Sequence, residues 1–302
     1  MTNCPTNHVL DPGGDLVTAL KVEPEQHSVE KAHEESLTVS SRQLILASGY
    51  FREQFGGPWK LRHQPNCRHV FQLPLKCTNS EAFMILMKIF HGHSRNVPRK
   101  VTLRTLTDIA LLVDTYKCLE AVESFADTWI CALNSRLPKA YSEVAHMWTY
   151  VAYIFEKAHI FQMMTKLAVK SSKGRIASHF PIPPTVFLKI GKQREAALIL
   201  RVLEFTNRTV SRLEHVATSN NCVSAGIILG TLSVRLADLR LLGHKPSQSF
   251  HYAGFTTISK ALNQLNIEET PSIRHRAKTI NSCLEALEKG IKGLQLCGVH
   301  EK

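Results

Sequence analysis

Long apolar runs are missing from this 302-residue sequence. The longest candidate, Phe83 to Phe90, is interrupted by Lys88, whereas a membrane-spanning helix needs about 18 apolar residues. With 44% hydrophobic and 21% charged residues, the composition is typical of a soluble globular protein. We therefore expect no membrane partner, and a chain of this length can bury the cores of two packed units.

Paired cysteines are also missing. The eight cysteines form neither a CxxC pair nor a CxxC and HxxxH set. The amino terminus has no basic start and no apolar core, so we see no secretory signal and expect an intracellular protein with reduced thiols, in the nucleus or the cytoplasm. His91 and His93 form an HGH pair without a neighbouring Cys or carboxylate, which favours a polar loop. We expect no metal site and no cofactor.

Motifs of catalysis are missing as well. The sequence has no Gly-rich phosphate loop, no GxSxG elbow and no acidic pair in a supporting context. We therefore expect no catalytic residues and a protein that is not an enzyme.

Acidic residues are scarce outside the first forty positions. The chain has 37 Lys and Arg against 25 Asp and Glu, a formal net charge of +12. The segment Glu23 to Ser36 is acidic and is interpreted as a surface loop. The basic remainder favours acidic partners, either nucleic acid or an acidic protein surface, and the charge alone does not choose between them.

The most informative segment that is present runs from Leu37 to Trp59. Leu37 and Val39 alternate with polar residues, which predicts a short half-buried strand. The pattern then changes to helical spacing after Ser40 and Ser41, which are predicted to cap the new helix. Gly49 allows a break before a second short helix, which ends at the Gly-Gly-Pro sequence that follows Phe55.

The flanking segments continue this order of elements. Asp15 precedes a predicted strand, Leu16 to Val22, and a third strand is predicted at Val70 to Pro74. Asn79 is predicted to cap a helix over Ala82 to Gly92, and Val101 to Leu133 predicts a closing pair of helices.

As an ordered set, these segments resemble the BTB/POZ fold, over roughly Asp11 to Asn134. The resemblance implies an α+β class, with a BTB/POZ domain (a small sheet with helices) at residues 11–134 after a flexible amino terminus at 1–10. Residues 138–302 predict an all-α carboxy-terminal domain. Its later helices are expected from about Cys222 to Leu242, from Thr257 to Leu265 and from Ser272 to about Leu296. Its YSEVAHMWTYVAYIFEKAHIF and PIPPTVFLKIGKQR segments resemble filamentous-fungal BTB proteins of unassigned function.

The resemblance implies non-catalytic protein–protein interaction, as a scaffold or adaptor. The expected partner-binding residues are exposed aromatic and neighbouring positions: Tyr50, Phe51, Phe55, Trp59, Lys60 and Leu61. BTB proteins that recruit cullin-type ubiquitin ligases carry an apolar residue, any residue, then Glu at this place. Trp59 matches the apolar position, whereas Leu61 replaces the Glu and removes a charge-assisted contact. A cullin adaptor is therefore an alternative weakened by Leu61.

The resemblance also raises the alternative of a homodimer. BTB domains commonly dimerise through the first long helix, here Leu44, Ile45 and Ser48, often with an amino-terminal strand that crosses to the partner. Val9 and Leu10 could supply such a strand.

A further alternative is a nuclear transcription or chromatin regulator that uses the basic helical tail. Arg194, Arg201, Arg208 and Arg212 share one predicted helix face, with Glu204 among them. Val186 and Ile190 are predicted to face inward on the same helix. We interpret the arginine stripe as a solvated face and expect no specific nucleic-acid complex, because no aromatic platform accompanies it.

Overall fold

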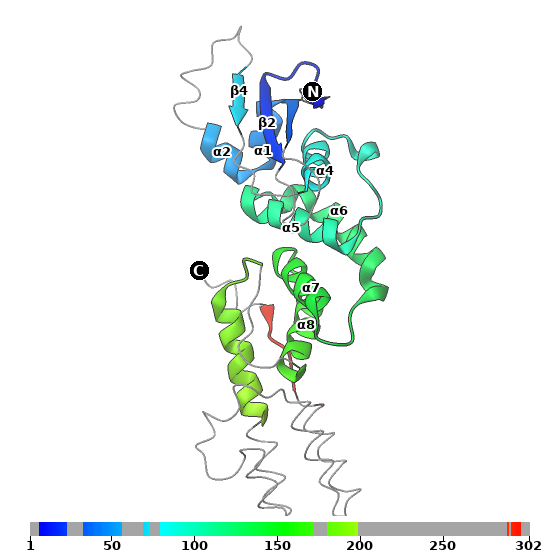
Figure 1. Ribbon diagram of the computed structural model, residues 1–302, viewed down its shortest axis with the longest axis vertical. Coiled ribbons are helices and arrows are strands. Elements are labelled where there is room, and N and C mark those ends of the chain that lie inside the picture. The colour runs from blue at the N-terminus through cyan, green and yellow to red at the C-terminus, as the bar shows by residue number, and fades with distance from the viewer. Residues whose placement is uncertain are drawn as a thin grey trace, which may run out of the picture. The chain divides into compact units, whose positions relative to one another are not determined.

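The chain divides into two compact units in the computed structural model (Figure 1). The structure describes residues 6–22, 33–55, 69–72, 79–171, 180–198, 289 and 291–296. The first unit contains Met1–Leu137 and Tyr150–Lys157, and the second contains Pro138–Thr149 and Ala158–Lys302. The expected boundary at residues 134–138 lies close to this division, except that residues 150–157 belong to the first unit.

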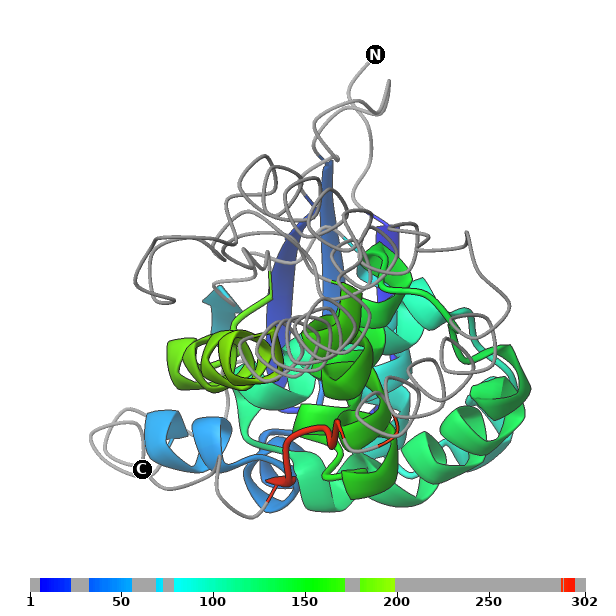
Figure 2. The same cartoon turned by 90° about the horizontal axis from the view of Figure 1, so that it is seen from below.

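The first unit contains a four-stranded mixed sheet in the order β1-β3-β2-β4. The strands are β1 (Thr6–Val9), β2 (Leu16–Val22), β3 (His33–Val39) and β4 (His69–Gln72). β2 and β3 pair antiparallel and lie side by side in Figure 2, whereas β1 is parallel to β3 and β4 is parallel to β2. The mixed sheet together with its helices makes an α+β fold.

Two of these strands differ from the sequence-based expectation. β2 is confirmed at its predicted bounds, but β3 begins at His33, inside the segment interpreted as an acidic loop. β1 lies within the ten residues expected to be flexible. Its backbone pairs with Glu35 to Thr38, and the Ser36 hydroxyl donates to Asn7 Oδ1 at 3.2 Å. Pairing with residues about 30 positions later in the sequence therefore fixes this strand at the amino terminus.

The helices of the first unit follow the predicted order. They are α1 (Ser41–Ala47), α2 (Gly49–Phe55), α4 (Ser80–Phe90), α5 (Leu103–Tyr116) and α6 (Leu119–Leu133), with short 3-10 turns at η1 (Ser94–Asn96) and η2 (Asn134–Arg136). Asn79 caps α4 as predicted, because its Oδ1 accepts from the Ala82 amide at 3.3 Å. The core of this unit includes Leu16, Leu20, Phe83, Tyr116 and Trp129, each no more than 1% exposed.

The described part of the second unit contains helices and one short segment from near the carboxy terminus. Helix α7 (Glu143–Ile154) supplies its first half to this unit, followed by α8 (Ala158–Ser171) and a helix at residues 184–198. Residues 291–296 also pack here, since the Leu294 amide donates to Thr165 Oγ1 of α8 at 2.9 Å. Val186 and Ile190 are buried as predicted. The other helices expected between residues 200 and 290 lie outside the described residues.

Candidate interaction surface

The start of α1 is held by two side chains that come from outside the helix. Asp15 accepts the Ser41 amide through Oδ1 at 2.8 Å and the Ser41 hydroxyl through Oδ2 at 2.5 Å. His91 Nε2 accepts the Ser40 amide at 3.0 Å. Ser40 itself makes no side-chain capping bond, so the predicted serine cap is wrong: His91 and Asp15 supply the acceptors for these amides. His91 lies in the turn that follows α4, and its side chain is buried.

The turn between α1 and α2 is fixed to the end of α5. The Ser48 hydroxyl donates to the Tyr116 carbonyl at 2.6 Å and accepts the Phe51 amide at 3.2 Å. The Gly49 amide donates to the Lys117 carbonyl at 3.1 Å. These bonds hold the two short helices as one hairpin against α5.

Aromatic rings anchor α2 in the core of the first unit. Phe51 stacks on Tyr116 and on Phe55, with ring centroids 5.2 and 5.7 Å apart, and Tyr50 meets Tyr116 edge to face at 5.4 Å. Phe51 and Phe55 are 0% and 1% exposed. Their prediction as partner-binding residues is therefore wrong, because they form core. Tyr50 is half-buried.

Some of the residues predicted for a dimer interface are buried in the structure, and others are exposed. Leu44, Ser48 and Leu10 are buried within the first unit, which corrects the predicted interface at these three positions. Ile45 is partly exposed, and Val9 is exposed but belongs to β1 of its own sheet. In the single chain, β1 pairs with β3 of its own sheet.

The exposed side of the hairpin is centred on Leu46, which the sequence reasoning did not single out. This side chain is 81% exposed, and Ile45 beside it is partly exposed. The Arg52 guanidinium donates to the carbonyls of Ile45 and Leu46 at 3.4 Å each, so it satisfies free carbonyls at the end of α1. We call Arg42, Ile45, Leu46 and Arg52 the hairpin face. A helix turns by about 100° per residue, so burial of Leu44 and Ser48 turns Leu46 outward.

Several predicted site residues lie outside the described residues. These are Trp59, Lys60 and Leu61 of the expected partner surface, and Arg201, Arg208 and Arg212 of the arginine stripe. Arg194 of that stripe is described and is 3% exposed, so its prediction as part of a solvated face is wrong.

Within the described parts of the chain, no group of three His, Cys, Asp or Glu side chains could hold a metal ion. No helix there is both long and apolar enough to cross a membrane.

Comparisons with known proteins add no relative: no family model, no curated protein and no solved structure matches this chain.

Proposed function

We propose that this chain is a non-catalytic protein–protein interaction module of the BTB/POZ kind. The order of elements in the first unit supports this proposal. An antiparallel strand pair leads into a two-helix hairpin, and β4, α4 and the α5–α6 pair follow in the order that the resemblance implies.

The single observation that carries the proposal is the exposure of Leu46 on a firmly held hairpin. A leucine that is exposed alone is common on protein surfaces. Here, however, Asp15 and His91 hold the start of α1, and Ser48 and Gly49 hold its end. Because these bonds already fix the backbone that carries Leu46, a partner that covers it need not order that backbone. Burying one leucine is worth about 1.5–3 kcal/mol.

The occupant that fits best is a second copy of the same chain. An interface with two-fold symmetry uses the same face on both protomers, so it buries Leu46 and Ile45 twice. The hairpin face also carries Arg42 and Arg52, which can remain at the polar rim while the apolar side chains meet.

Sedimentation of the full chain tests this self-association. We expect Leu46→Asp to raise the dissociation constant at least about tenfold, because the carboxylate would be buried without a partner. Its melting temperature should match that of the wild type, since position 46 is exposed.

Leu188→Asp is the matched control. Leu188 is 60% exposed and lies in the second unit, on the helix at residues 184–198. A wild-type chain that stays monomeric at high micromolar concentration would remove the proposal. An equal loss of association in Leu188→Asp would show that the hairpin face is not the interface.

A further inference from the structure

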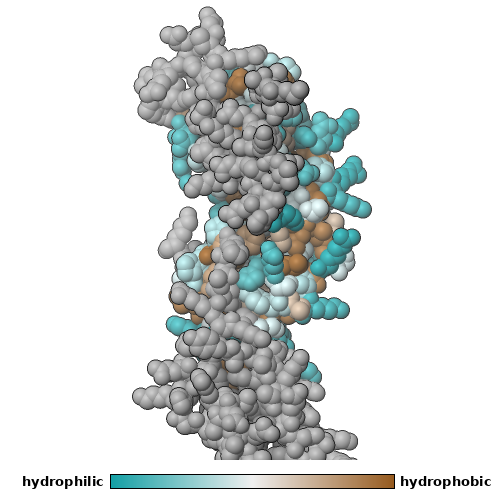
Figure 3. Space-filling model, in the orientation of Figure 1, coloured by the Kyte–Doolittle hydropathy of each residue, from teal (hydrophilic) through white to brown (hydrophobic). Residues whose placement is uncertain are grey.

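The connection between α4 and α5 is strongly basic, together with the first turn of α5. Residues 91–104 contain four Lys and Arg, no Asp and no Glu. The four cations are all exposed: Arg95, Arg99, Lys100 and Arg104. We call these four residues the basic loop, and Figure 3 shows hydrophilic side chains projecting from the right-hand edge of the first unit, where this connection lies.

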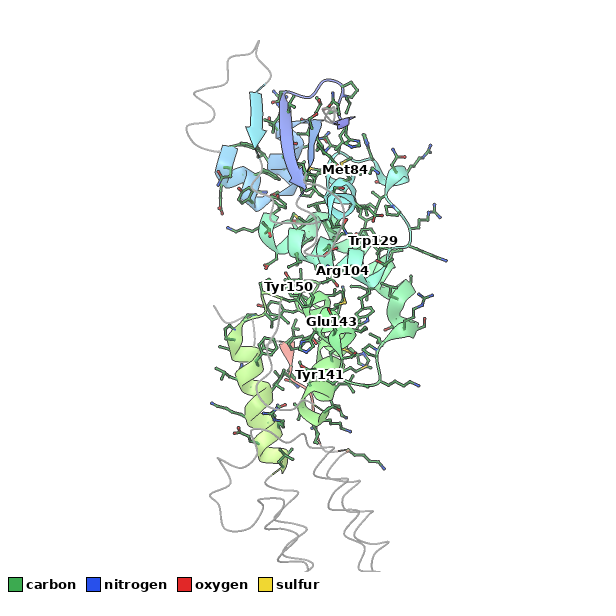
Figure 4. All side chains as sticks on the ribbon, viewed as in Figure 1. Met84, Arg104, Trp129, Tyr141, Glu143 and Tyr150 are labelled. Carbon is green, nitrogen blue, oxygen red and sulfur yellow. The ribbon has the colours of Figure 1, made fainter. Side chains whose placement is uncertain are left out.

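Specific contacts hold the backbone that carries these cations. The His93 amide donates to the Lys88 carbonyl at 2.9 Å, and Val97 is buried. Trp129 Nε1 of α6 donates to the Pro98 carbonyl at 2.7 Å, and the Trp129 ring is itself buried. Figure 4 labels Trp129, which holds the loop, and Arg104, the last of its cations. The positive groups therefore stand on a fixed backbone.

Among the described residues, a neighbouring acid pairs with one of the four cations of the basic loop, Arg104. Among the described residues, Arg95, Arg99 and Lys100 make no ion pair, and Arg104 Nε lies 3.8 Å from Asp108 Oδ2. Asp127, two residues before Trp129 on α6, is bound by Lys157 at 2.5 Å. Several like charges thus lie within ten residues and give this edge a positive potential.

We propose that the basic loop is a docking site for an acidic segment of a partner protein. Spaced carboxylates on such a segment complement the spaced cations. A nucleic acid fits less well, because proteins that bind single strands combine cations with exposed aromatic rings. The aromatic residue that contacts this loop, Trp129, packs on Phe125 of the same helix at 6.1 Å and is only 1% exposed.

This inference is independent of the hairpin face, since it uses other residues. Fluorescence anisotropy with the full chain at physiological salt tests it directly. The probes are a labelled peptide of alternating Glu and Ser, its Gln and Ser counterpart, and a labelled double-stranded DNA. We expect the acidic peptide alone to bind, with an affinity that falls as salt is raised.

The deciding variant is the double substitution Arg99→Glu and Lys100→Glu. It should weaken acidic-peptide binding about tenfold or more, because two surface ion pairs are lost and replaced by repulsion. Lys192→Glu with Lys292→Glu is the matched control, with the same change in net charge at exposed positions of the second unit. Both variants should have the same melting temperature as the wild type.

Three results would overturn the proposal. The wild type could fail to bind the acidic peptide. The control variant could lose binding as much as the basic-loop variant, which would indicate net charge alone. The DNA could bind more tightly than the peptide and be lost in the basic-loop variant, which would make this edge a nucleic-acid interface.

Discussion

His91 uses both of its ring nitrogens inside the first unit. Nε2 accepts the Ser40 amide at 3.0 Å, and Nδ1 donates to the Met87 carbonyl at 2.8 Å. Only the neutral ring can accept at Nε2, so the geometry fixes its protonation state. Burial lowers the pKa of His91, and His93 lowers it further, whereas the Met87 carbonyl and Asp11 act in the opposite direction.

The lowered pKa makes the stability of the first unit dependent on pH. The unfolded chain takes up a proton at His91 near pH 6.5, whereas the folded chain resists protonation. Stability contributed by neutral His91 is therefore complete above pH 6.5 and is lost as pH falls through the folded pKa. Urea unfolding across this range should show the decline.

Two variants separate His91 from the other titrating groups. His91→Ala should be less stable at neutral pH and should flatten the acid decline, because it removes the titrating group. His93→Ala should keep most of the decline, because burial is the main cause of the lowered His91 pKa and His93 the smallest. An unchanged pH slope in His91→Ala would show that another group is responsible.

Arg194 shows how far residue patterns in the sequence could predict burial. Val186, Ile190, Arg194 and Leu198 recur every four residues, and all four are buried. The four-residue spacing can be read from the sequence, but the charge of Arg194 suggested that its side chain is solvated. Burial lowers the pKa of Arg194, while the nearby Glu195 and Tyr141 raise it. Packing of the second unit, which a single helix does not reveal, decides this position.

At the scale of elements, local signals predicted most of the first unit. Alternation predicted β2, and the Asn79 cap and apolar spacing predicted α4. An amino-terminal strand was expected only at Val9 and Leu10, as one that crosses to a partner, whereas β1 covers Thr6–Val9 and pairs with residues 35–38 of its own chain. The hairpin was predicted, but which of its sides faces the core was not. That choice depends on Ser48 and Phe51 meeting Tyr116, about 65 residues later.

The buried aromatic stack makes a direct prediction for α2. Phe51→Ala should lower the free energy of unfolding by about 3 kcal/mol, because it leaves a cavity between Tyr116 and Phe55. Gln54→Ala on the exposed side of the same helix should be nearly neutral. Chemical denaturation of both variants measures the difference. Equal stabilities would place Phe51 at the surface, as the sequence reasoning expected.

At the scale of the whole molecule, residues far apart in sequence complete the second unit. The Leu294 amide donates to Thr165 Oγ1, and Thr165 in turn donates to the Phe161 carbonyl at 2.8 Å. Ile291, Leu294 and Leu296 are buried in this arrangement. No local pattern predicts it, since the sequence reasoning assigned residues up to about 296 to a final helix. Residues 291–295 are not helical, which corrects the last turns of that prediction.

Gly293 is the position on which this long-range contact depends most. A methyl group there would collide with the Gln162 carbonyl of α8 and would lie 2.8 Å from Thr165 Oγ1. Because the obstacle is helix backbone, it cannot move aside easily. Gly293→Ala should therefore lower the free energy of unfolding by about 1–3 kcal/mol. Hydrogen exchange at the Leu294 amide should also become faster, because its acceptor is displaced.

Gly191→Ala is the matched control for this change. Gly191 lies within the helix at residues 184–198, and a methyl group there meets nothing within 4 Å. Alanine loses less backbone entropy than glycine in a helix, so this variant should gain about 0.5–1 kcal/mol of stability. Opposite signs for the two Gly→Ala changes would establish that residues 291–296 pack against α8. Unaltered stability and exchange in Gly293→Ala would refute that packing.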